Sequence, residues 1–492
     1  MSVAPFSIML VIGILSCILF SSDLKDSLQK LFVLGIFVNL NIRMGYFLKL
    51  GDKEISIMSI VLLAMTGVSV VVAITRKMSA SYLKWIWCFF TVLLISCGLL
   101  ILFTYQKELI TASTSWDYYI KEMAQKSFLD PNSVRYKGYL LMLVEYTIIL
   151  WAGKTVFSRK NWEDIFARVL ALSKISLIVG ILEFICKNVF HSLALTRFFI
   201  FLFGNSSATH DYLDYSGGGL IALQGMTKEK AMFAFVLFLI AVMLLVENFR
   251  LRSTEDENAR KINRNFLWLM LTLLLLGINM ALSSCIYLGI LLLLALILSK
   301  KQELNPRIRW IFLGTAVLGI LAIGTIYTSG IVEGMMGSAN RFLQRLGNAF
   351  YTLKMLGSGS ALSVSSEVIR FRSIYDTILI ILDRPLFGIG LGATYCTSGL
   401  FTMMSGIGIG GVGFWLLMLS KGFLKLDMNS KHFIWIVLLV MVAPNLLTNE
   451  FTAMLMLGSP VILLNLKYVY MDLECLEPAC QYEVRGKNCY DG

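Results

Sequence analysis

The chain has few charged residues and very few histidines. Charged residues make up 15% of the 492 residues, whereas soluble domains carry about 25%, so an ordinary soluble protein is excluded. The three histidines, His191, His210 and His432, are too few for a histidine-rich metal site. No HExxH, DxD or Ser/His/Asp arrangement stands out in the sequence. We therefore predict that the protein holds no metal ion.

Phosphate-binding loops and zinc motifs are missing as well. The glycine runs 388–392 (GIGLG) and 406–413 (GIGIGGVG) do not follow a strand in a βαβ unit, which a nucleotide-binding loop requires. The second run lies within a predicted membrane span, where small residues let helices approach closely. The C-terminal Cys475, Cys480 and Cys489 match no zinc-binding spacing. Neither a nucleotide site nor a zinc site is indicated.

What the chain does contain is long apolar runs. Hydrophobic residues make up 57% of it, and the mean hydropathy is +0.75. An apolar run of about 20 residues crosses the hydrocarbon core as a helix, and lipid offers no water to satisfy the backbone of a lone strand. The sequence therefore predicts an all-α, polytopic integral membrane protein with about 12–13 transmembrane helices. The predicted spans are 5–20, 30–48, 55–74, 84–103, 136–156, 166–187, 229–247, 265–282, 285–299, 310–328, 396–419, 432–448 and 453–470, of which 30–48 is the weakest.

The positions of Lys and Arg predict the orientation. These residues gather in five short loops, at 76–84, 154–160, 250–264, 300–309 and 421–431, which the positive-inside rule places in the cytoplasm. This retention signal and anionic lipid account for the net charge of +12, so nucleic acid is not an expected partner. Three segments then form outer loops, at 104–135, 188–228 and 329–395. We expect one integral-membrane domain over 1–470 and a cytoplasmic tail over 471–492.

The third outer loop is the longest and contains an amphipathic segment. Its run SIYDTILIILD (373–383) places Ile374, Ile378, Ile381 and Leu382 on one helical face. Because the run is too short to cross the bilayer, we predict a helix that lies on the outer membrane surface. Pro385 ends this helix, and glycines at 388, 390 and 392 allow a tight turn toward the next span.

The same loop carries four arginines that are candidate phosphate ligands, namely Arg341, Arg345, Arg370 and Arg372. Guanidinium groups bind phosphate bidentately and stay charged at any relevant pH. At the start of a surface helix, Arg370 and Arg372 are predicted to sit at the height of a lipid phosphate. Composition alone gives equal weight to ordinary headgroup anchoring and loop packing.

The second outer loop supplies the remaining polar candidates, which are Arg197, His210, Asp211, Asp214, Lys228 and Glu229. Imidazole titrates near neutral pH, so His210 is a candidate to take a proton from a sugar hydroxyl, although a lone loop histidine is more often solvated. Glu229 stands at the foot of a span, where the helix dipole also stabilises an acid for purely structural reasons.

These two loops carry a family resemblance. The third reads S-x-x-x-R-F-x-S-I, an amphipathic helix, P-L-F-G-I-G-L-G and then a glycine-rich span. In this order it resembles the O-antigen polymerase and ligase superfamily of bacterial membrane proteins, with matches at Ser366, Arg370, Phe371, Ser373, Pro385, Gly388, Gly390 and Gly392. The stretch 223–234 resembles an earlier family element, with matches at Gln224, Gly225, Thr227 and Glu229. It departs from that element at Ala222, where an arginine is common, and at Lys230-Ala231, which replace Pro-Ser; Arg197 and Lys228 are candidates to substitute.

The resemblance implies polymerisation of undecaprenyl-diphosphate-linked oligosaccharide repeat units into O-antigen or capsular or exopolysaccharide. The expected place is the outer face of the bacterial inner (cytoplasmic) membrane. Ligases of the superfamily place a histidine just after the Pro-x-x-Gly-x-Gly turn, and this chain has none there, which favours polymerase over ligase. The implied partners are the lipid-linked oligosaccharide, membrane lipids, a chain-length regulator and a flippase.

The implied reaction is a glycosyl transfer in which a diphosphate leaves the anomeric carbon. Fixed arginines that face the growing charge stabilise the transition state by about 3 kcal/mol per donor. Arg370 is the predicted diphosphate ligand, with Arg372 or Arg345 as its second contact. The base for the acceptor hydroxyl stays open among Glu229, His210, Asp211 and Asp214. Because the donor is already activated, no cofactor is expected.

The competing class is a transporter, for instance a lipid-linked oligosaccharide flippase. Transporters tend to show internal repeats and discontinuous spans with charges at the bilayer midplane. No repeat is obvious in this sequence, and the long third outer loop is unlike a compact carrier. Arg43 and Glu183 are the ionisable residues that we place within the spans.

Overall fold

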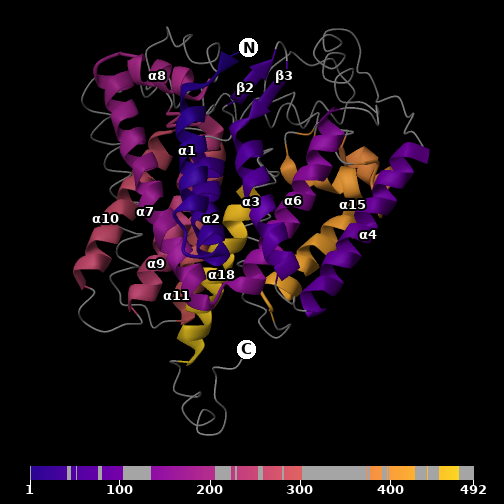
Figure 1. Cartoon of the computed structure of the whole chain (residues 1–492). Coiled ribbons are helices and arrows are strands. Elements are labelled where there is room, and N and C mark those ends of the chain that lie inside the picture. The colour runs from indigo at the N-terminus through magenta and orange to yellow at the C-terminus, as the bar shows by residue number, and fades with distance from the viewer. Residues whose placement is uncertain are drawn as a thin grey trace, which may run out of the picture. The chain divides into compact units, whose positions relative to one another are not determined.

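The computed structural model describes residues 2–41, 46–50, 53–75, 80–102, 134–204, 223–227, 230–252, 259–279, 282–301, 374, 377–390, 396, 398–426, 440 and 454–475. Figure 1 shows these elements as coloured ribbons. The chain divides into two compact units. Unit 1 comprises Met1–Ser158, Ser338–Asn429 and Met441–Pro460, and unit 2 comprises Arg159–Gly337, Ser430–Val440 and Val461–Gly492. The single domain over 1–470 stays a prediction.

Unit 1 consists of helices and one small sheet. Its elements are β1 (Ser2–Val3), α1 (Pro5–Leu19), α2 (Leu24–Asn41), β2 (Tyr46–Leu50), β3 (Lys53–Ser56), α3 (Ile57–Thr75), α4 (Ala80–Leu102), α6 (Val134–Val156), α15 (Gly399–Leu417) and the π-helical turn η4 (Met418–Phe423). Helix α3 packs between α2 and α6, and α4 packs along α15 and η4, so that α4 and α15 lie side by side (Figure 1).

Unit 2 is built around one almost completely buried helix. Its elements are α7 (Arg159–Phe184), the π-helical turn η1 (Ile185–Val189), α8 (Ala194–Phe203), α9 (Lys230–Arg252), α10 (Ala259–Ile278) and α11 (Leu282–Lys301), and it includes α18 (Met454–Cys475) from Val461 on. Helix α9 contacts α7, α10 and α11, and 94% of its Met232–Leu251 stretch is buried. A helix that is apolar on every side belongs in such a central position.

The predicted spans match the observed helices closely, apart from 30–48. Span 310–328 lies outside the described residues, as does 432–448 except for residue 440. Helix α2 ends at Asn41, and Tyr46–Leu50 form strand β2, so the predicted helix to residue 48 is wrong. Polar Asn39 and Asn41 weaken the run, and the chain instead pairs with its neighbours in the antiparallel order β1-β2-β3. Lys49 lies opposite both Ser2 and Glu54, and this pairing satisfies backbone groups that a lone strand would leave open.

The described helices have the surface of an all-α membrane protein. Five are long and apolar enough to cross a membrane, namely Ile57–Thr75, Arg159–Val189, Met232–Leu251, Arg260–Ile278 and Gly399–Phe423. Large apolar side chains lie uncovered on the outside of several helices: Leu19 is 71% exposed, Ile74 80% and Leu94 70%. Soluble monomers rarely expose contiguous apolar surface, whereas lipid covers it at no cost.

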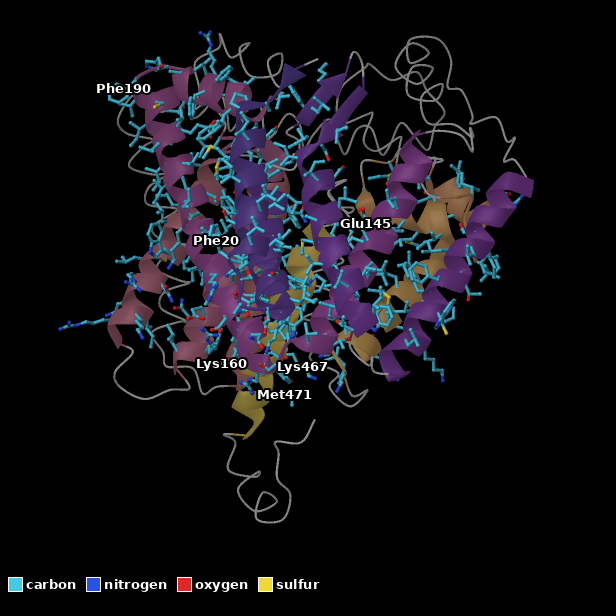
Figure 2. All side chains as sticks on the ribbon, viewed as in Figure 1. Phe20, Glu145, Lys160, Phe190, Lys467 and Met471 are labelled. Carbon is cyan, nitrogen blue, oxygen red and sulfur yellow. The ribbon has the colours of Figure 1, made fainter. Side chains whose placement is uncertain are left out.

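Two contacts join segments near the predicted cytoplasmic loops, while the orientation itself stays a prediction. In unit 1, the Lys154 ammonium lies 5.6 Å from the centre of the Phe423 ring. In unit 2, the Arg159 guanidinium lies 5.0 Å from the centre of the Tyr468 ring. Lys154, Arg159 and Phe423 lie in loops that the charge pattern assigns to the cytoplasm. Tyr468 lies shortly before the predicted C-terminal tail. Figure 2 shows Lys160 and Lys467 at one end of unit 2 and Phe190 at the opposite end.

Candidate functional site

Of the residues predicted to act on substrate, only Arg197 lies within the described part of the chain. Arg197 is exposed on α8, and its backbone N–H donates to the carbonyl of Leu193 at 2.9 Å. The other predicted residues lie outside the described residues: Arg341, Arg345, Arg370, Arg372, His210, Asp211, Asp214, Lys228 and Glu229. Their roles stay predictions. Two segments that carry the family resemblance are described, however, and each is held in the fold by an unusual set of contacts.

The first segment, residues 223–227, contacts a buried ion pair at the end of α7. Glu183 and Lys187 are 1% and 0% exposed, and the Lys187 Nζ lies 2.5 Å from the Glu183 Oε1. The two are four residues apart, which places them on one face of a helix. The pair spans the junction of α7 with η1, and single π-helical turns of this kind are frequent at functional sites.

The Glu183 carboxylate also binds the backbone of the Gln224–Gly225 turn. Its Oε2 accepts the N–H of Gln224 at 2.9 Å and the N–H of Gly225 at 2.6 Å. Its Oε1 accepts the hydroxyl of Thr196, on α8, at 3.3 Å. Two successive N–H groups that converge on one anion form a nest, the concavity that commonly binds phosphate. In this protein the anion is a carboxylate of the chain itself.

The turn is tight and is wedged from the other side by an aromatic ring. The Thr227 N–H donates to the Gln224 carbonyl at 3.0 Å, and Gly225 has φ +58°, which only glycine adopts freely. A Cβ on Gly225 would lie 2.4 Å from the Phe233 ring, and one on Gly180 would lie 2.7 Å from the same ring. Phe233, in the first turn of α9, therefore fills the space between α7 and the turn.

Sequence reasoning placed Gln224, Gly225 and Thr227 in a motif but missed Lys187 and Thr196 as their neighbours. The signal for Lys187 was present, because an acid and a base four residues apart in an otherwise apolar helix form a pair. Placing only Arg43 and Glu183 within the spans was also incomplete. Glu145 lies inside α6 and is 8% exposed (Figure 2). Lys174 lies inside α7 with its Nζ 3.5 Å from the Asn265 Oδ1.

The second segment is the Pro385–Gly390 turn, which docks into a break in α15. Gly408 has φ 74° and ψ 171°, so the helix is interrupted there. The N–H of Ile389 donates to the Ser405 carbonyl at 2.8 Å, that of Gly390 to the Gly406 carbonyl at 2.9 Å, and that of Ile409 to the Pro385 carbonyl at 2.7 Å. Thus groups freed by the break bond to the turn. The glycine run was predicted to let helices approach closely, whereas at Gly408 the chain that approaches is this turn.

The helix before this turn agrees with the prediction in its position but only in part in its face. Residues 377–383 are helical, and the helix ends before Pro385, as predicted. Ile381 is buried, whereas Ile378 is 36% and Leu382 71% exposed. These residues were predicted on one face, but they divide between the protein interior and the outside. The rest of the long outer loop, apart from residues 374 and 377–390, lies outside the described residues.

Within the described ranges, no three His, Cys, Asp or Glu side chains come together in a way that could hold a metal ion. Comparisons with protein-family models, with curated proteins and with solved structures find no match to this chain.

Proposed function

We propose that this membrane protein polymerises lipid-diphosphate-linked oligosaccharide repeat units, with Arg370 holding the leaving diphosphate and Arg372 or Arg345 as its second contact. The observation that carries the proposal is the interlock of the Pro385–Gly390 turn with the break in α15. This turn is the C-terminal part of the segment that resembles the O-antigen polymerase and ligase superfamily.

The interlock between the turn and α15 supports the proposal because it requires glycine at two positions of the resembling segment and the span that follows it. Gly388 has φ +66°, and a Cβ on it would lie 2.3 Å from the Ser405 carbonyl oxygen. Position 408 must also be glycine, because a Cβ there would lie 2.1 Å from the Leu386 carbonyl oxygen. A fixed turn shortly after Arg370 and Arg372 in the sequence suits a reaction that depends on charges held in place before the transition state forms.

A flippase is the second candidate, because a discontinuous span is typical of transporters. In transporters the carbonyls of the unwound stretch face a cavity and coordinate an ion or substrate. Here the Ser405 carbonyl accepts from Ile389, and the Gly406 carbonyl accepts from both Gly390 and the Ser96 hydroxyl, the latter at 2.7 Å. The break is thus occupied by protein, which favours an anchoring role over ion coordination.

The test uses purified protein in detergent with a short lipid-linked repeat unit, and the products are resolved by chain length on a gel. A ladder supports polymerisation. A single transfer onto a lipid A core would indicate a ligase, and faster lipid translocation in liposomes without new bonds would indicate a flippase.

The variant that tests the site is Arg370→Ala, which we expect to abolish the ladder at unchanged expression. The matched control is Arg260→Ala, because Arg260 is exposed at the start of α10 in a predicted cytoplasmic loop. An undiminished ladder from Arg370→Ala would refute the assignment of the diphosphate site.

A further inference from the structure

Glu183 joins the two segments of unit 2 that lead to predicted substrate residues. Its Oε1 bonds to Thr196, and Arg197 is the next residue in the chain. Its Oε2 bonds to the backbone of Gln224 and Gly225, and the chain continues from Thr227 directly to Lys228 and Glu229. One carboxylate on α7 therefore fixes α8 and the turn that precedes α9.

Stability is a weak explanation for this arrangement. A buried ion pair loses the hydration of both charges, and replacing such a pair with apolar residues of similar volume is often neutral or stabilising. Glu183 and Lys187 are almost completely enclosed, so they carry that cost in full. The carboxylate does, however, provide something an apolar residue lacks, which is an acceptor for two converging N–H groups.

We propose that Glu183 is a positioning residue, whose carboxylate fills the nest of Gln224 and Gly225 and holds the 223–227 turn in its active arrangement. The inference rests on the proposed polymerase function for its effect on activity, but the contact itself is independent of that function. Lys187 neutralises the carboxylate and is the partner that allows it to be buried as an ion.

The experiment compares two double variants that differ only in the polar atoms of one side chain. Glu183→Met with Lys187→Met removes both charges and the acceptor. Glu183→Gln with Lys187→Met removes both charges but keeps one carbonyl oxygen in reach of the nest. Both replace the pair with side chains of similar length, so both are expected to fold.

Two measurements are made on each variant and on the wild type: hydrogen exchange at the Gln224 and Gly225 amides, and formation of the polymer ladder from the lipid-linked repeat unit. In the Met/Met variant we expect exchange at both amides to rise at least ten-fold and the ladder to fall at least ten-fold, because removing the acceptor leaves both N–H groups unsatisfied. The Gln/Met variant should recover most of the protection and most of the ladder. A general loss of stability would instead raise exchange throughout unit 2 and not at these two amides alone.

Other results overturn the inference in distinguishable ways. If the Met/Met variant keeps both its amide protection and its ladder, Glu183 does not hold the turn. If protection is lost while the ladder is unchanged, the turn has no positioning role. A wild-type protein that makes no ladder refutes the proposed function, yet the exchange measurement still tests the nest. Should Met/Met fail to fold, Glu183→Asp keeps the charge pair and withdraws the carboxylate by about one bond length; unchanged exchange there overturns the inference.

Discussion

Replacing Gly408 with alanine tests whether the break in α15 is needed for the stability of the fold. Its φ of 74° and ψ of 171° fall in a region that is essentially restricted to glycine, and a residue forced into it costs about 1–3 kcal/mol. The added Cβ would also lie 2.1 Å from the oxygen and 2.2 Å from the carbon of the Leu386 carbonyl. Backbone atoms cannot move aside without displacing the whole turn.

The magnitude follows from the contacts that the displaced turn would lose. Three backbone hydrogen bonds join residues 385–390 to α15, and each contributes about 1 kcal/mol net. With the backbone strain, the expected loss is about 5 kcal/mol. Because whole domains are stable by only about 5–15 kcal/mol, Gly408→Ala should leave much less folded protein.

The same helix offers a graded control series. At Gly410 a Cβ would meet the Leu386 carbonyl oxygen at 2.8 Å, and at Gly413 it would meet no atom of the described part of the chain within 4 Å. In a helix, alanine is favoured over glycine by about 1 kcal/mol, so Gly413→Ala should be neutral or stabilising. We expect the unfolding midpoint in mild detergent to fall in the order Gly413→Ala, Gly410→Ala, Gly408→Ala. A Gly408→Ala protein as stable as Gly413→Ala would refute the interlock.

Three further predictions concern the Gln224 turn and the start of α2. Gly225→Ala should destabilise unit 2 by about 2 kcal/mol or more because of its positive φ and the ring beside it. Gly277→Ala should not, because a Cβ there meets no atom of the described residues within 4 Å, and equal unfolding midpoints for the two variants would contradict this. Gln224→Met should not lower the midpoint, because the buried Gln224 Nε2 has no hydrogen-bond partner among the described residues, and an unsatisfied buried donor costs about 1–3 kcal/mol. A clear loss of stability would show that the amide is bound. The hydrogen bond from Lys30 holds the pKa of Asp26 below its usual value. The ionised Asp26 therefore makes a small contribution to stability above the unfolded-state pKa of about 3.9, and this contribution is lost as the pH falls through the lower folded-state pKa. A pH titration of the unfolding midpoint should show this loss in the wild type and a flatter curve in Lys30→Met.

The sequence by itself determined the class of the protein and the positions of its helices. Apolar runs of this length have one solution in lipid, because only a helix satisfies its own backbone there. Pro385 and Gly388 likewise predicted a helix end and a turn, because the fixed φ of proline and the conformational freedom of glycine are local properties. The span 30–48 failed for the opposite reason: whether Tyr46–Leu50 forms a strand depends on pairing with Ser2–Val3 and Lys53–Ser56, which no local pattern contains.

The tertiary structure decided what the two motif segments touch. Nothing in the run LQGMT indicates that a carboxylate some forty residues earlier in the chain fills its nest, because contacts between distant residues depend on how α7, α8 and α9 pack. The glycines at 406–413 were predicted to allow close approach, but only the fold identifies the approaching chain as the Pro385–Gly390 turn. Sequence set the local backbone options, since these depend on neighbouring residues alone, and packing selected the partners.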